Sequence, residues 1–324
     1  MKKRQFIAVL GAALLGTGVT QAQTAFPAQQ AVKWVVPYAP GGTTDVIARN
    51  LAIGMSKELG QTVVVENKPG AATIIGATQI VRSPADGYTV GTADSGTLAF
   101  NPAMYRSLSY DAQKDFSFIG GLGRMPLVLA VHPDFPAKNM REFLAHVRSH
   151  PGEVTSGSSG PGSPLHVALE LFKQRTGSNL LHVPYKGSAP ALQDLMAGQV
   201  QTMFVDLPPS LSMIKGGKLR VLAVATPERM AILPDVPTMA EAGVPGFEAY
   251  AWQGFVGPAK LSAPVVQRLN KDLNAALAQP ALRAKFEEIG IQPMAMTPRE
   301  FGDFVRSEQK LWSEVIRSAK IQLD

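Results

Sequence analysis

The chain has 324 residues, with 31 Lys and Arg against 25 Asp and Glu, and it contains no Cys. A basic excess this small, spread along the chain, does not indicate a nucleic-acid partner. The absence of Cys excludes disulfides, and about 300 residues are enough for two lobes that each bury a core.

The first 22 residues have the pattern of a secretory signal peptide. Lys2, Lys3 and Arg4 precede a short apolar run over 6–15, and small residues end at Ala22, where we predict cleavage. Cleavage lowers the basic count from 31 to 28 against 25 acidic residues, a net charge of +3. No later run reaches the roughly 20 apolar residues of a membrane span. We therefore expect a soluble periplasmic protein.

The first predicted strand, 33–36, leads into a glycine-rich turn and then a helix that ends at Gly60. Gly41 and Gly42 leave backbone N–H groups accessible, and Thr43 and Thr44 add hydroxyl groups at the helix start. A helix N-terminus of this kind suits an anion. Thr43 and Thr44 can cap the helix, bind a ligand, or do both, and we favour both.

Two neighbours of this turn each have two interpretations. Asp45 stands four residues before Arg49, the spacing of an ion pair within a helix. Since a carboxylate repels an anionic ligand, we favour a structural role for Asp45, with a water-bridged ligand contact as the alternative. Tyr38 ends the strand and points either into a ligand cleft or into the packed interior.

The later segments continue to alternate between strands and helices. The predicted strands are 63–65, 88–92, 127–131, 182–185, 202–205 and 219–225; the predicted helices are 74–82, 139–149, 164–176, 189–197, 265–278, 280–289 and 298–319. This alternation predicts an α/β protein with mostly parallel sheets flanked by helices. We find no short repeat and no low-complexity linker.

The chain is predicted to cross between lobes twice, near 124–126 and near 249–251. Lobe 1 would then be discontinuous, formed by 23–125 plus 251–324. Lobe 2 would be formed by 126–250.

A second anion-binding turn is predicted over 156–163, a Gly/Ser loop before a helix. Ser163 can cap that helix, and Pro164 suits its first position. Ser158, Ser159 and Gly160 can form a nest of backbone N–H groups for a carboxylate.

Together these motifs resemble those of a known family. The series includes YAPGGTTD at 38–45 with Arg49, VENKPG at 65–70, PADGYT at 84–89, NP at 101–102, YD at 110–111, HVPYKG at 182–187, GKLR at 217–220 and LPDVPT at 233–238. Their order and spacing resemble the Bug receptors, the extracytoplasmic solute-binding proteins of tripartite tricarboxylate transporters. Ala71-Ala72-Thr73 departs from the glycine-rich stretch that is usual after 69–70, which puts the local backbone near the cleft in doubt.

The resemblance implies a two-lobed periplasmic binding protein fold of type II, with the ligand in the cleft between the lobes. A carboxylate end of the ligand would be held by the turns at 41–45 and 158–163, partly through ordered waters. The partners would be a small carboxylate ligand and the permease subunits of the transporter, with no cofactor.

Four other residues are weighed as ligand contacts. Asp206 follows a strand, where ligands bind in open α/β sheets, but it can also cap the next helix. Ser95, Asn101 and Trp252 are candidates for the distal half of the ligand, and Trp252 can equally pack at a crossing between the lobes.

Metal binding and catalysis are disfavoured. His146 and His150 stand four apart on a helix, but no third zinc ligand has suitable spacing. His166 is interpreted as a cleft wall or a packed core residue, and His182 as core.

Other functions fit the sequence less well. It lacks the G-x-S-x-G elbow of a secreted hydrolase and the phosphate-binding loop of an NTPase. A binding protein that signals to a periplasmic sensor domain stays open as an alternative output.

Overall fold

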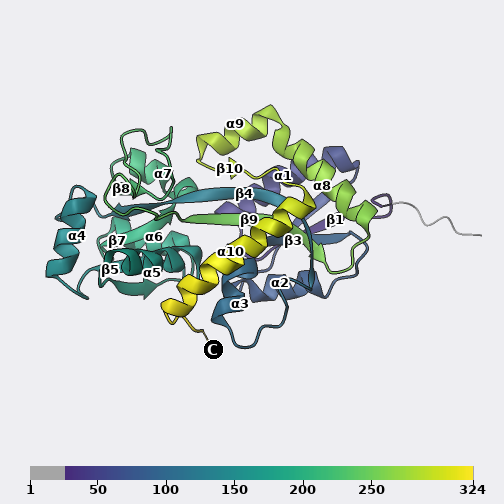
Figure 1. The fold of residues 1–324 in the computed structure, drawn as a ribbon. Coiled ribbons are helices and arrows are strands. Elements are labelled where there is room, and N and C mark those ends of the chain that lie inside the picture. The colour runs from purple at the N-terminus through teal and green to yellow at the C-terminus, as the bar shows by residue number, and fades with distance from the viewer. Residues whose placement is uncertain (1–25, 324) are drawn as a thin grey trace, which may run out of the picture.

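Two strands join the two lobes of this α/β fold. The computed structural model describes residues 26–323, so the predicted signal peptide and its cleavage site after Ala22 lie outside the described residues. Strand β4 (Phe116–Val131) pairs with β9 (Tyr250–Pro258) up to Pro126 and with the strands of the second lobe from Leu127 onward. Figure 1 shows both strands along the middle of the molecule.

The first lobe contains the sheet β2-β1-β3-β9-β4. Strand β1 (Val32–Val36) lies parallel between β2 (Val63–Asn67) and β3 (Thr89–Asp94), while β3, β9 and β4 pair antiparallel. The two-residue strand β10 (Gln292–Pro293) also pairs with β4. The helices of this lobe are α1 (Thr43–Leu59), η1 (Ala71–Thr73), α2 (Ile74–Val81), η2 (Gly96–Phe100), α3 (Asn101–Met104), α8 (Ala263–Ala278), α9 (Pro280–Glu288) and α10 (Pro298–Ser318).

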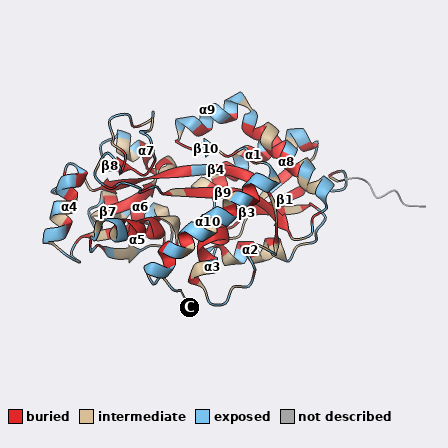
Figure 2. Ribbon diagram, in the orientation of Figure 1, coloured by how far each residue is buried: buried red, intermediate tan, exposed pale blue. Residues whose placement is uncertain are grey.

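The second lobe is built on the order β4-β7-β5-β6, with β8 also paired to β4. The strands are β5 (Thr155–Ser158), β6 (Leu181–Pro184), β7 (Thr202–Asp206) and β8 (Arg220–Val224); the helices are α4 (Met140–Ser149), α5 (Pro164–Thr176), α6 (Ser188–Met196) and α7 (Leu207–Lys215). In Figure 2 the central strands of both lobes are mostly buried and the outer faces of the helices are exposed, whereas the edge strands β2 and β6 also carry exposed positions.

The sheets are mixed rather than mostly parallel. Parallel pairing joins β1 with β2 and β3, and β5 with β6 and β7, whereas every pairing of β4 and β9 is antiparallel. The prediction therefore holds only for the outer strands. The predicted lobe division, 23–125 with 251–324 and 126–250, stays a prediction, and the partner change of β4 supports it.

Local sequence signals account well for the helices. Helix α1 ends at Gly60 in the left-handed conformation, as its glycine predicts. Helix α10 begins with a capping box formed by Thr297 and Glu300. Helix α5 begins after Ser163, whose Oγ accepts a hydrogen bond from the His166 N–H, and this cap is confirmed. None of the helices within 26–323 combines the length and apolar character that crossing a membrane requires.

Candidate functional site

The glycine-rich turn leaves the start of α1 open. The N-cap is Gly42, and no side chain caps the first turn within the described residues. Thr43 and Thr44 are the first two helical residues, so the prediction that they cap the helix is wrong. Gly41 and Gly42 are exposed, and Gly41 has φ +85°, which glycine adopts at little cost. The exposed turn therefore presents backbone N–H groups at the positive end of the helix dipole.

Asp45 holds this turn together. Its buried carboxylate accepts hydrogen bonds from the Gly41 N–H, Arg49 Nε and Asn67 Nδ2, each at 2.9 Å. Burial alone would raise the pKa of Asp45, but the hydrogen bonds from Arg49, Gly41 and Asn67 outweigh it and lower the pKa. Both carboxylate oxygens are thus engaged inside the protein, which is the structural role that the sequence favoured.

Thr44 connects the turn to the strand that joins the lobes. Its Oγ1 accepts a hydrogen bond of 2.7 Å from Nε2 of Gln253, a buried residue of β9. Oε1 of Gln253 is also buried and has no hydrogen-bond partner within residues 26–323. Sequence reasoning missed Gln253, because nothing in the segment around it marks a polar residue as buried.

Asp94 is a second buried residue that sequence reasoning missed. It ends β3 opposite Gln253 in the antiparallel register, and one of its oxygens accepts from the N–H and Oγ1 of Thr97 at 2.9 and 2.8 Å. The other oxygen accepts a short hydrogen bond from the Tyr38 hydroxyl. Asp94 could have been found from the sequence, because it is a carboxylate at the carboxyl end of a strand, the same feature that identified Asp206 as a candidate.

Tyr38 lies between acidic groups of both lobes. Burial, together with the negative charges of Asp94 and Asp206, raises the pKa of Tyr38 well above its ordinary value. Because the charge of Asp206 reaches Tyr38, the end of β7 in lobe 2 lies near the end of β1 in lobe 1. Tyr38 therefore combines features of both interpretations: it is packed against Asp94, and it also faces the junction of the lobes.

Asp206 occupies the N-cap position of α7, but its side chain makes no capping hydrogen bond. Its Oδ2 accepts from the Ser188 hydroxyl at 3.4 Å. Burial raises the pKa of Asp206 to about 6. The capping alternative is therefore wrong, and the carboxylate is turned toward the first residue of α6.

The second turn is built around histidines as well as glycines. Ser158 is fully buried, and its Oγ lies 2.7 Å from Nε2 of His182 and 3.2 Å from the Gly160 N–H. This turns the Ser158 hydroxyl inward, although a serine next to a histidine also suits a nucleophile. Ser158 has no exposed surface in this arrangement of the lobes. Ser159 is half-buried, and its carbonyl oxygen accepts from Gly187 N–H at 3.1 Å.

The rings of His166 and His182 stack with centroids 3.9 Å apart. Nδ1 of His166 accepts a hydrogen bond of 3.0 Å from the Gly162 N–H, which fixes the turn to α5. Burial, assisted by His182, lowers the pKa of His166 to about 3. The two rings therefore form a neutral support beneath the turn. A side chain at Gly162 would collide with Met104 and Leu323, so this lobe 2 turn lies against lobe 1.

The remaining candidates differ in their surroundings. Ser95 is fully buried next to Asp94, and its Oγ has no partner within the described residues. Asn101 is buried and donates to the Ala72 carbonyl at 2.9 Å and to the Tyr110 hydroxyl at 3.2 Å. Trp252 is buried against Phe301 and Phe304, and its Nε1 donates to Glu308 at 2.7 Å. The side-chain N–H groups of Asn101 and Trp252 thus donate hydrogen bonds within the protein.

The unusual stretch after Gly70 has an unusual backbone. Ala71, Ala72 and Thr73 have φ of 45°, 49° and 74°, in the left-handed region that glycine normally occupies. The bond from Asn101 to Ala72 and a 2.7 Å contact between the Thr73 and Thr97 hydroxyls hold this conformation. The segment therefore keeps a glycine-like path without glycines.

The histidine pair on α4 is placed away from these turns. The rings of His146 and His150 stack with centroids 4.2 Å apart. Residues 26–323 bring together no group of three or more His, Cys, Asp or Glu side chains able to hold a metal ion.

Comparison with known proteins gives consistent matches. A family model described as "Tripartite tricarboxylate transporter family receptor" matches residues 47–321. Protein BugT of Bordetella pertussis is 35% identical over 326 residues, which covers 100% of both chains.

Two solved structures share the fold over nearly the whole chain. One, described as a periplasmic transporter, is 40% identical with a TM-score of 0.86 and covers 93% of this chain and 100% of its own. The R. palustris protein Rpa4515, solved with adipate, is 36% identical with a TM-score of 0.87 and covers 92% of this chain and 99% of its own.

Proposed function

Because the chain belongs to the tripartite tricarboxylate transporter receptor family, we propose that it captures a small carboxylate between its lobes and delivers it to membrane permease subunits. It is a solute-binding receptor and not an enzyme. The predicted leader over 1–22 would direct it to the periplasm. The observation that carries the proposal is the uncapped start of α1, where the exposed Gly42 and the first helical residues can present backbone N–H groups to an anion, while the Gly41 N–H is held by Asp45.

The ligand contacts are proposed from both lobes. The turn over 41–44 would hold one carboxylate, and the turn over 158–163 would close on it. Buried polar atoms are normally hydrogen bonded, so Ser95 Oγ and Gln253 Oε1 are proposed to face the ligand or its ordered waters. Asp45, Asn101 and Trp252 are proposed to support the site from behind.

Asp206 and Tyr38 would limit which ligands fit. An ionised Asp206 accepts hydrogen bonds and repels a carboxylate, so it favours a ligand that offers a hydroxyl or another donor there. Rpa4515 was solved with adipate and MatC from Rhodopseudomonas palustris with malate, so both acids are suitable members of a test panel.

The test is a thermal-shift screen of the mature protein against small carboxylates, followed by calorimetric titration of those that raise the melting temperature. A ligand at 100 times its dissociation constant adds about 2.7 kcal/mol to the free energy of unfolding. Thr43→Val with Ser163→Ala should weaken the affinity. Asn139→Ala, which removes a side-chain cap from α4 in lobe 2, is the matched control for the lost cap of Ser163.

Unchanged affinity in the double variant would remove both turns from the site. The transport and sensing outputs separate in a pull-down, where purified permease subunits or a periplasmic sensor domain compete for the liganded receptor. Retention by the sensor domain alone would transfer the proposed output from transport to signalling.

A further inference from the structure

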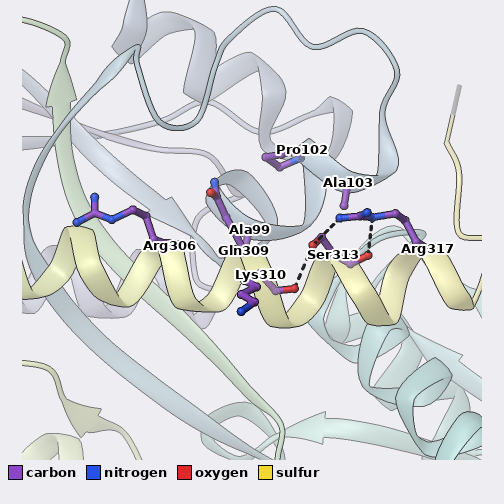
Figure 3. A pocket seen from close by; sticks show the side chains of 8 residues that line it. All are labelled: Ala99, Pro102, Ala103, Arg306, Gln309, Lys310, Ser313 and Arg317. Atoms are coloured by element: carbon purple, nitrogen blue, oxygen red, sulfur yellow. Dashed lines mark hydrogen bonds between the residues drawn. The ribbon is translucent and has the colours of Figure 1, made fainter.

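A basic groove runs along one face of α10. Arg306, Gln309, Lys310, Ser313 and Arg317 recur at helical spacing on this face, and Ala99, Pro102 and Ala103 form the opposite wall (Figure 3). The hollow has a volume of about 580 Å³. It lies between the long C-terminal helix and the segment η2–α3.

The groove continues into a second hollow of about 350 Å³, which shares Ala103 and Arg317 with the first. This part adds Arg106 and Lys320. Of the described residues that line the two hollows, five are Lys or Arg and none is Asp or Glu. A surface this one-sided attracts anions.

The cations of the groove differ in their partners. Arg306 pairs with Asp303. Arg317 donates to the carbonyl and hydroxyl oxygens of Ser313 at 3.1 and 3.0 Å, and Arg106 donates to Gln322 Oε1 at 3.2 Å. Ser313 is neutral, so it orients the Arg317 guanidinium without cancelling its charge.

Helix α10 contacts both lobes. In lobe 1, Trp312 packs edge-on against Phe100 with centroids 5.4 Å apart. In lobe 2, Gln174 of α5 donates to the Val315 carbonyl at 3.1 Å. Figure 1 shows α10 crossing the molecule and ending near α5. The shape of the groove therefore depends on the relative position of the lobes.

We propose that this groove is a docking surface for an extended acidic segment of the membrane transporter, and that it fits this segment in the closed arrangement of the lobes. The proposal rests on the proposed function. From residue 306 to 317 the helix face extends about 17 Å, the length of about five extended residues. An open groove of that length suits a peptide better than one small anion.

The described arrangement brings Asp206 near Tyr38 and Gly162 against Met104, so it corresponds to lobes in contact. A carboxylate that favours closure should then raise the affinity for the acidic segment. The same coupling makes the segment raise the affinity for the carboxylate.

The test uses the mature protein and a labelled peptide of about 12 residues, alternating Glu and Ser, with fluorescence anisotropy as the readout. Lys310→Glu with Arg317→Glu should weaken binding at least about tenfold, because opposing charges become like charges. Lys271→Glu with Arg283→Glu carries the same charge change on exposed residues of α8 and α9 and should retain binding within about twofold. The Lys310→Gln, Arg317→Gln pair repeats the test with less perturbation of the fold.

Equal losses in the groove variant and the control would overturn the proposal, since net charge alone would then explain binding. Equal competition by inorganic phosphate would reassign the groove to a small anion, and equal competition by phosphatidylglycerol vesicles would reassign it to the membrane surface. Adipate or malate, where it raises the melting temperature, should strengthen peptide binding several-fold; no change would overturn the dependence on closure. If no carboxylate raises the melting temperature, the proposed function fails while the peptide results still stand.

Discussion

Asp45 shows how one carboxylate can fix the backbone of the proposed anion site without itself facing the anion. Its carboxylate accepts hydrogen bonds from Gly41 in the exposed turn and from Arg49 and Asn67, so a residue of the helix fixes the turn. The negative charge is buried and compensated, which lets the exposed backbone face an anionic ligand.

Replacement of Asp45 should separate these effects. Asp45→Ala is expected to lower the free energy of unfolding by about 1–3 kcal/mol, because three donors lose their acceptor. It should also weaken carboxylate binding, because the turn is no longer fixed. Urea unfolding and calorimetric titration measure the two effects. Glu66→Gln, in a half-exposed cluster with Lys33 and Lys68, is the control and should cost less than about 1 kcal/mol. Full stability in Asp45→Ala would contradict the structural role.

His166 should make the protein sensitive to acid. Its pKa is lowered from 6.5 to about 3 in the folded state, so the unfolded chain takes up a proton at a higher pH than the folded chain does. The stability from neutral His166 is present above pH 6.5 and is lost as the pH falls toward 3. Between pH 6.5 and 5 the expected loss is about 2 kcal/mol.

His166→Asn should reduce the dependence of stability on pH, because it removes the titrating imidazole. The amide oxygen of Asn can still accept the hydrogen bond from Gly162 in place of Nδ1. Urea unfolding at a series of pH values is the measurement, and His150→Asn controls for the loss of a histidine elsewhere. A slope identical to that of the parent protein would assign the acid sensitivity to another group.

Sequence patterns identified the residues of the turns but not the buried groups behind them. Gly41, Gly42 and Ser163 follow local rules for turns and caps. Asp94 and Gln253 lie opposite each other only because β3 and β9 pair across 159 residues of chain. No local pattern encodes such a pairing, so a long-range contact decides that their side chains share one face.

At the scale of elements, β9 is both a strand of the sheet and the connection between the lobes. Trp252 lies within it, and its indole packs against α10 and donates to Glu308 of that helix. Burial raises the pKa of its acceptor Glu308, which the N–H groups of Trp252 and Trp312 partly offset. The tryptophan therefore binds the connecting strand to the C-terminal helix.

Trp252→Phe should destabilise the protein by about 1–3 kcal/mol, because buried Glu308 loses one of its two indole donors. Carboxylate affinity should stay within about twofold of the parent value. Urea unfolding and titration provide the readouts, with Trp312→Phe as the matched loss of the other donor. A large fall in affinity at unchanged stability would restore Trp252 as a ligand contact.

The element predictions succeeded where caps and glycines mark the ends, as for α1, α5 and α10. They failed where composition opposes the structure. Residues 155–158 form the buried strand β5 although Ser and Gly suggested a loop, because pairing with β6 and β7 on both sides determines the conformation. The glycine-rich first half of β4 was missed for the same reason, and β9 was missed although its aromatic residues and Val suit a strand.

At the scale of the molecule, β4 and β9 connect the sheets of the lobes within residues 26–323, while α10 contacts both lobes from outside. Such an architecture permits closure by small changes in the connecting strands. The predicted two-lobed α/β fold is confirmed in its overall form, whereas strand direction at the junction was not accessible from periodicity.

Small-angle X-ray scattering should detect closure. The radius of gyration of the mature protein should fall when a carboxylate that raises the melting temperature is added, because the ligand contacts both lobes and favours the closed state. The Thr43→Val, Ser163→Ala variant, measured at the same concentrations, should show a smaller change. An unchanged radius in the parent protein at saturation would exclude closure on binding.

The pairing of β3 with β9 has a consequence for biosynthesis. Strand β9 begins at residue 250 of a 324-residue polypeptide. Until the ribosome has passed that position, the nascent chain lacks a strand that its first sheet requires. Completion of the first sheet is thereby postponed toward the end of translation.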